Sequence, residues 1–76
     1  MTYIANLTVI EALVESRLGK KLDELGSSLS IWSDTLILDI GYEEIHITKM
    51  VDNYMTTREV IQLAIIILGE LEHKLV

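Results

Sequence analysis

The sequence predicts a small α+β domain in which a helix, a three-stranded antiparallel meander and a second helix follow one another, an α-β-β-β-α order. Three observations predict it. Apolar residues recur at helical spacing near both ends of the chain, each time after a T-x-x-E sequence. Between these runs, apolar and polar residues alternate with the period of a half-buried strand. The alternating segments are separated by short breaks, which favours antiparallel pairing and leaves both helices to pack on one face of the sheet.

The first helix is expected over about residues 8–25. Thr8 and Glu11 form a capping-box sequence at its predicted start. Gly19 lies where the apolar stripe shifts, so we expect a kink or a short break there. Gly26 is the predicted stop, because glycine accepts the left-handed conformation that ends many helices. The residues expected to share the first apolar face are Val9, Ile10, Leu13 and Val14, followed by Leu18, Leu22 and Leu25 on a rotated face.

The sheet is expected between residues 28 and 48. Ser33-Asp34 and Gly41–Glu43 are the predicted turns, and the second strand could extend to Glu43. Alternation predicts which side chains point toward the helices: Leu29, Ile31, Leu36, Leu38, Ile40, Ile45 and Ile47. The opposite face is expected to show Trp32, Ile37, Asp39, Glu44, His46 and Thr48.

The second helix is expected over about residues 57–74, after a loop at residues 52–54. Its capping-box sequence runs from Thr56 to Glu59. The apolar arc of this helix is wider than a single packing surface requires. We therefore expect the helix to touch the sheet and the first helix, or a second subunit. The arc has Val60, Ala64, Ile67, Leu71 and Leu75 at its centre and Ile61, Leu63 and Leu68 at its flanks.

Length and composition exclude several classes of protein. The chain has 76 residues, which fits one domain over residues 1–76. It contains no cysteine, which excludes disulfides and cysteine-based zinc sites and fits a cytoplasmic location. Twelve Asp and Glu against 6 Lys and Arg give a net charge of −6, which disfavours direct binding to nucleic acid. No signal peptide is expected, and the most apolar stretch has about half the 20 residues that a membrane span needs.

The αβββα order is similar to that of double-stranded-RNA-binding domains. Such domains grip phosphates with lysines at the start of their second helix. Here that segment contains Arg58 beside Glu59, and the strands before it are mostly acidic. The similarity therefore implies the element order alone, and no RNA-binding residues are expected.

The sheet face turned away from the helices is the predicted partner-binding surface. An exposed Trp32 beside an exposed Ile37 resembles a binding patch, since tryptophan is enriched among interface hot spots. The alternative is a small local cluster in which Trp32 folds over Ile37 or over the edge of a helix. The acidic segment 34–52 is the part expected to meet a basic partner. Together the predicted partner-binding residues are Trp32, Asp34, Ile37, Asp39, Glu43, Glu44, His46 and Asp52.

Catalytic, cofactor and metal sites are not expected. The serines and threonines lie outside the known nucleophile motifs, and the isolated glycines form no phosphate-binding loop. Asp39, Glu44 and His46 could share one face, but their spacing matches no metal-binding motif. They are expected to be solvated surface residues.

The second helix also predicts a homodimer. Ile66 projects from its otherwise polar side, so a contact between two copies is expected there. The predicted dimer residues are Ile66, Glu70 and His73.

Three functions remain after these exclusions. The leading interpretation is a non-enzymatic protein that occupies a basic surface of a larger partner, where its carboxylates take the place of phosphates. Phage-encoded inhibitors of host defence or nucleic-acid-binding proteins often have this size and charge, and act in the host cytoplasm. One alternative is an oligomer that sequesters a small molecule such as a nucleotide signal. The other is a structural or assembly subunit.

Overall fold

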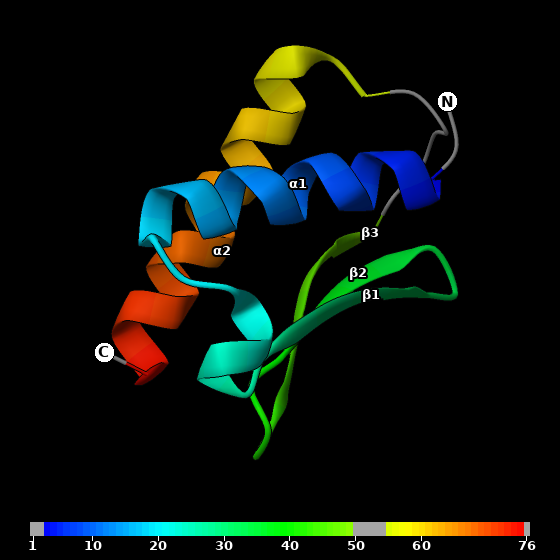
Figure 1. Cartoon of the computed structure of the whole chain (residues 1–76). Helices are drawn as coiled ribbons and strands as arrows, with labels where there is room; N and C mark the ends of the chain where they lie inside the picture. The colour runs from blue at the N-terminus through cyan, green and yellow to red at the C-terminus, as the bar shows by residue number, and fades with distance from the viewer. Residues whose placement is uncertain (1–2, 50–54, 76) are drawn as a thin grey trace.

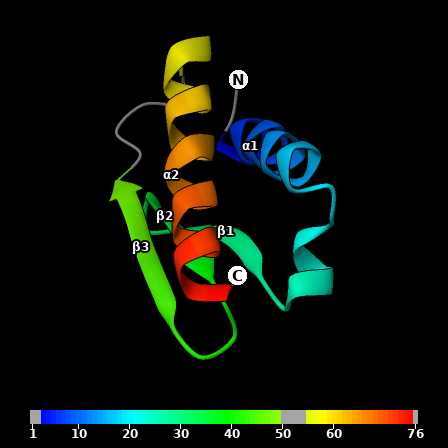
Figure 2. The same cartoon turned by 90° about the vertical axis from the view of Figure 1, so that its left-hand side faces the viewer.

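The predicted element order is confirmed by a computed structural model, which describes residues 3–49 and 55–75, with side chains from Leu7 onward. The three strands form one antiparallel sheet in the order β1-β2-β3. Both helices lie on the same side of this sheet, with α1 crossing α2 (Figures 1 and 2). The elements are α1 (Tyr3–Leu18), a 3-10 helix η1 (Leu22–Leu25), β1 (Ser28–Trp32), β2 (Thr35–Asp39), β3 (Glu44–Lys49) and α2 (Thr57–Leu75).

The predicted start of the first helix at Thr8 is wrong, because α1 already begins at Tyr3. A capping box marks a start only where the preceding residues leave the helix, and the residues before Thr8 include no glycine or proline to end it. The expected break at Gly19 is confirmed. Gly19 has a φ of 72°, and η1 follows as a separate turn that Gly26 ends at a φ of 69°. Both angles lie in the left-handed region that glycine adopts without strain.

The first apolar stripe of α1 does not face the sheet as a whole. Ile10 and Val14 are completely buried, whereas Val9 and Leu13 are exposed. The single face expected for these four residues is therefore divided between the core and the surface. The helix has apolar residues on two sides, and only one of them is covered within the described part of the chain.

The strands follow the predicted pattern up to one irregularity. Ser33 and Asp34 both have positive φ, as a two-residue hairpin of the I′ kind requires. Between β2 and β3 the register shifts, because Ile37 pairs with His46 while Leu36 pairs with Thr48. This β-bulge leaves Ile47 without a directly opposite residue. It also places Thr48 on the side of Leu36, so the prediction that Thr48 belongs to the other face is wrong.

The core lies between the sheet and the two helices. The side chains predicted to point toward the helices do so: four are buried and Ile31, Ile45 and Ile47 pack against them while partly exposed. The second helix contributes the largest share of the core, as its arc predicts. The buried residues of the core are Ile10, Val14, Leu22, Leu29, Leu36, Leu38, Ile40, Val60, Leu63, Ala64, Ile67 and Leu71.

The start of α2 is the predicted capping box. The Thr56 N–H donates to Glu59 Oε1 at 3.0 Å, and the Glu59 N–H donates to Thr56 Oγ1 at 3.2 Å. The Thr56 hydroxyl also donates to the same carboxylate oxygen at 3.0 Å. The backbone bond first and the hydroxyl bond second hold the pKa of Glu59 below its ordinary value of 4.5. The carboxylate form of Glu59 therefore stabilises this end of the helix.

This capping box predicts a loss of stability in acid. Because the pKa of Glu59 is lower in the folded chain, its contribution is complete above the unfolded value near 4.5 and disappears as pH falls through the folded value. Glu59→Gln keeps an oxygen that accepts the same bonds but removes the titration. Between about pH 6 and pH 3, the melting temperature is expected to fall further for the wild type than for this variant. Equal falls would mean that the capping box carries no proton linkage.

Candidate interaction surface on the sheet

The sheet face opposite the helices is built from residues that pair directly across the three strands. Side chains at paired positions of antiparallel strands point to the same side, so the register defines this face. No described helix or strand lies over it (Figures 1 and 2). We call it the outer face. Its three rows are Ser28–Asp39–Glu44, Ser30–Ile37–His46 and Trp32–Thr35–Lys49.

Ile37 lies at the centre of the outer face, and its side chain is only 5% exposed. The prediction of an exposed Ile37 is therefore wrong. The helices cannot bury it, because it lies on the other side of the sheet from the core, so its neighbours on the outer face shield it. These neighbours surround a hollow of about 460 Å³ that is open to solvent. The hollow is lined by Ser30, Trp32, Ile37, Glu44 and His46.

Trp32 forms one wall of this hollow and remains 74% exposed. It is the last residue of β1, next to the turn at Ser33 and Asp34. Pairing with Thr35 fixes its backbone at the end of the hairpin. Asp34 is exposed in the adjoining turn. Trp32 and Ile37 line the same hollow, and Ile37 is buried while Trp32 stays largely exposed.

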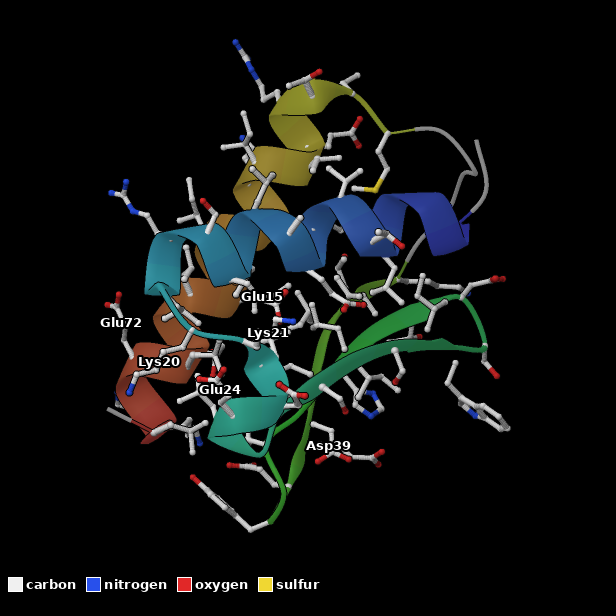
Figure 3. The ribbon with its side chains drawn as sticks, viewed as in Figure 1. Glu15, Lys20, Lys21, Glu24, Asp39 and Glu72 are labelled. Atoms are coloured by element: carbon white, nitrogen blue, oxygen red, sulfur yellow. The ribbon has the colours of Figure 1, made fainter. Side chains whose placement is uncertain are left out.

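The predicted acidic residues do not form one continuous surface. Glu44 belongs to the hollow, whereas Asp39 accepts a hydrogen bond at 2.8 Å from the Gly41 N–H and so stabilises the following turn. Figure 3 shows Asp39 at the end of the sheet near this turn, on the side away from α1. Asp52 lies outside the described residues.

Glu43 has a structural partner that the sequence did not reveal. Its Oε1 lies 3.0 Å from Lys74 Nζ at the end of α2. The Tyr42 hydroxyl donates to the Lys74 carbonyl oxygen at 3.4 Å in the same region. The hydrogen bond that Lys74 donates to Glu43, and then the negative charge of Glu43, raise the pKa of Lys74 above its ordinary value of 10.5. These contacts join the β2–β3 loop to α2, so the carboxylate of Glu43 already has a partner within the chain.

Two further carboxylates, those of Glu11 and Glu15, lie on the helix side of the molecule. Glu15 Oε2 accepts a hydrogen bond at 2.8 Å from the Leu22 N–H, and Figure 3 shows Glu15 directed from α1 toward the segment that carries Lys21. Partial burial first, and then the charge of Glu15, raise the pKa of Glu11 above 4.5. Both residues line an open hollow of about 330 Å³ between α1 and η1. The bond from Leu22 gives Glu15 a structural role in holding the connection after α1.

The predicted dimer residues lie on the solvent side of α2. Ile66 is 48% exposed and His73 is exposed, whereas Glu70 is partly buried. The most exposed large apolar residue of the helix is Ile65, at 60%. Sequence reasoning did not single it out. A helical projection does mark Ile65, because it lies on the same side of the helix as Arg58, two turns earlier, and Glu72, two turns later.

The described residues contain no group of three or more His, Asp or Glu side chains placed to hold a metal ion. Over the same residues, no helix combines the length and hydrophobicity that crossing a membrane requires. Comparison with known proteins adds no relative: no protein-family model matches the chain, and no significant match was found among curated proteins or solved structures.

Proposed function

We propose that the chain is a non-enzymatic protein-interaction module that binds a basic surface of a larger protein through its outer face. The observation that carries the proposal is the exposed Trp32 beside the hollow that Ile37 floors. Tryptophan at the edge of a surface depression is a common binding hot spot, because it loses much water-exposed area on contact. The uncovered side of the sheet makes this depression accessible.

The charges around the hollow favour a cationic partner. Glu44 lines it and Asp34 lies in the turn next to Trp32. An indole face attracts ammonium and guanidinium groups, and a nearby carboxylate can pair with the same group. A protruding arginine or lysine side chain thus fits the hollow chemically. If the partner surface normally binds nucleic acid, occupation by this chain blocks it, which is the mode of action of an inhibitor.

An experiment that removes negative charges next to the hollow tests the proposal. The tagged chain is used to capture its partner from cells of origin, and the captured protein is then purified for titration. Asp34→Asn with Glu44→Gln removes two charges next to the hollow. The expected result is a dissociation constant raised by about tenfold or more, with a steep weakening from about 0.05 to 0.5 M salt for the wild type.

The matched control removes the same number of charges elsewhere. Asp23→Asn with Glu24→Gln changes two exposed carboxylates on η1, neither of which lines the hollow. Binding is expected to change little in this variant. Equal weakening by both pairs would show that only net charge matters. A thermal shift with a nucleotide library, without any protein partner, would instead favour the small-molecule interpretation.

A further inference from the structure

The outer side of the two helices carries a second apolar surface, separate from the outer face of the sheet. Figure 2 shows α2 foremost, with nothing in front of it. An apolar groove of about 350 Å³ runs between α1 and α2, and Leu13, Arg17, Ile61, Ala64, Ile65 and Leu68 line it. The exposed large apolar residues of this groove are Leu13, Ile61 and Ile65, and Val9 lies one helical turn before Leu13 on α1. We call these four residues the helix patch.

The face of α2 that carries Ile65 has an internal symmetry. Arg58 lies seven residues before Ile65 and Glu72 lies seven residues after it, which is about two helical turns each way. Ile61 and Gly69 lie four residues before and after it. Residues at these spacings share one side of a helix. The exposed ridge therefore has a basic end, an apolar middle and an acidic end, and Figure 3 shows Glu72 projecting outward from α2.

The two charged ends lack partners within the described chain. The ion pair that the structure shows joins Lys74 and Glu43, and for the residues described no ion pair involves Arg58 or Glu72. Gly69 is equally unexplained by the fold of one copy, because a β-carbon at this position would meet nothing within 4 Å. Glycine inside a helix is unfavourable relative to alanine, so its small size fits a contact from outside the chain.

We propose that a second copy of this chain covers the helix patch, with the two α2 helices antiparallel about a two-fold axis at Ile65. In this arrangement Arg58 of each copy meets Glu72 of the other. Ile65 meets its own equivalent, and Ile61 packs where Gly69 leaves room. A parallel arrangement would place like charges together at both ends. The charge pattern therefore selects the antiparallel dimer.

The proposed dimer contact lies beside the one that the sequence predicted. Ile66 adjoins the ridge, but the centre moves from Ile66, Glu70 and His73 to Ile65. The outer face lies on the opposite side of each domain and stays free. Such a dimer presents two outer faces, so it would bind a repeated partner with increased avidity. The dimer itself does not depend on the identity of that partner.

Sedimentation equilibrium of the full chain at high micromolar concentration tests the association. The expected species has about 17 kDa, twice the 8.6 kDa of one chain. Ile65→Lys places two ammonium groups at the axis and is expected to give a monomer with an unchanged far-UV circular dichroism spectrum. A wild-type chain that sediments as a monomer at this concentration overturns the proposal.

A charge exchange tests the antiparallel register. Arg58→Glu and Glu72→Arg each turn two attractive contacts into repulsive ones, and each is expected to raise the dissociation constant of the dimer about tenfold. The double variant restores attraction and is expected to recover the wild-type value within about threefold. A dimer that both single variants leave unchanged, or that the double variant fails to restore, contradicts this arrangement.

Two control variants separate this surface from the outer face. Glu24→Arg makes the same charge change as Glu72→Arg, but on η1, and is expected to leave the dimer unchanged. Trp32→Ala alters the outer face and is also expected to leave it unchanged. Loss of the dimer in Trp32→Ala would place the contact on the sheet and overturn the helix-patch proposal.

Discussion

Replacing Trp32 with alanine is expected to weaken binding of the basic partner by about thirtyfold or more, the effect of removing a hot-spot residue worth about 2 kcal/mol. The indole is 74% exposed and borders the hollow, so a partner that fills the hollow must contact it. Because the side chain contributes little to the core between sheet and helices, the variant is expected to stay folded. Isothermal titration calorimetry measures the binding, and thermal melting checks the fold.

Tyr42→Ala is the matched control for this prediction. Tyr42 is the other strongly exposed aromatic residue among those described, at 67%, but it lies in the β2–β3 loop and not at the hairpin end. Its hydroxyl makes only a long, exposed hydrogen bond to Lys74. Partner binding is expected to remain near the wild-type value. If both aromatic variants lose binding equally, general surface hydrophobicity and not the outer face is responsible.

Leu38→Ala is expected to destabilise the domain by about 3–5 kcal/mol, because truncation of a buried leucine removes its transfer free energy and leaves a cavity. Leu38 is completely buried in the central strand and faces both helices across the core. A chain of this length has a total stability of about 4–11 kcal/mol, at 0.05–0.15 kcal/mol per residue. The variant is therefore expected to lose a large fraction of the stability of the domain, which the free energy of unfolding from urea denaturation measures.

Ile37→Ala provides the comparison for Leu38→Ala. The two residues are neighbours on β2 and similarly buried, but Ile37 faces an open hollow. Water can enter the space that truncation leaves there, so the cost is expected to be about 2 kcal/mol from transfer alone. Equal losses of stability in the two variants would show that the outer face is as tightly packed as the core, contrary to the hollow described above.

The strands and the second helix were predictable because their signals are local and complete. Period-two alternation fixes the strand faces, and Ser33-Asp34 suits a two-residue hairpin turn. The capping box of Thr56 and Glu59 forms at the start of α2, as expected. The similar box at Thr8 failed for a physical reason: it lies within a longer helix that begins at Tyr3. A capping motif alone does not show whether the chain before it is already helical.

The details of the candidate site depended on contacts that alternation does not specify. Alternation correctly placed Ile37 on the outer face. It did not predict that Ile37 is buried there, because this burial arises from neighbours on three strands. The bulge near Ile47 has no marker in the sequence, and it moves Lys49 and not Thr48 onto the row of Trp32. The ion pair of Glu43 with Lys74 joins residues 31 positions apart, so only the folded chain brings it together.

Site-specific photocross-linking in the cells of origin tests most directly whether the outer face binds a partner. A photoreactive phenylalanine analogue replaces Ser30 in one variant and Tyr42 in another, since Ser30 is exposed and lines the hollow beside an intact Trp32, whereas Tyr42 lies in the β2–β3 loop. We expect a strong covalent adduct with a single basic protein from position 30, weakened by salt, and little of it from position 42. Absence of any adduct from position 30, or the same adducts from both positions, would contradict binding through the outer face.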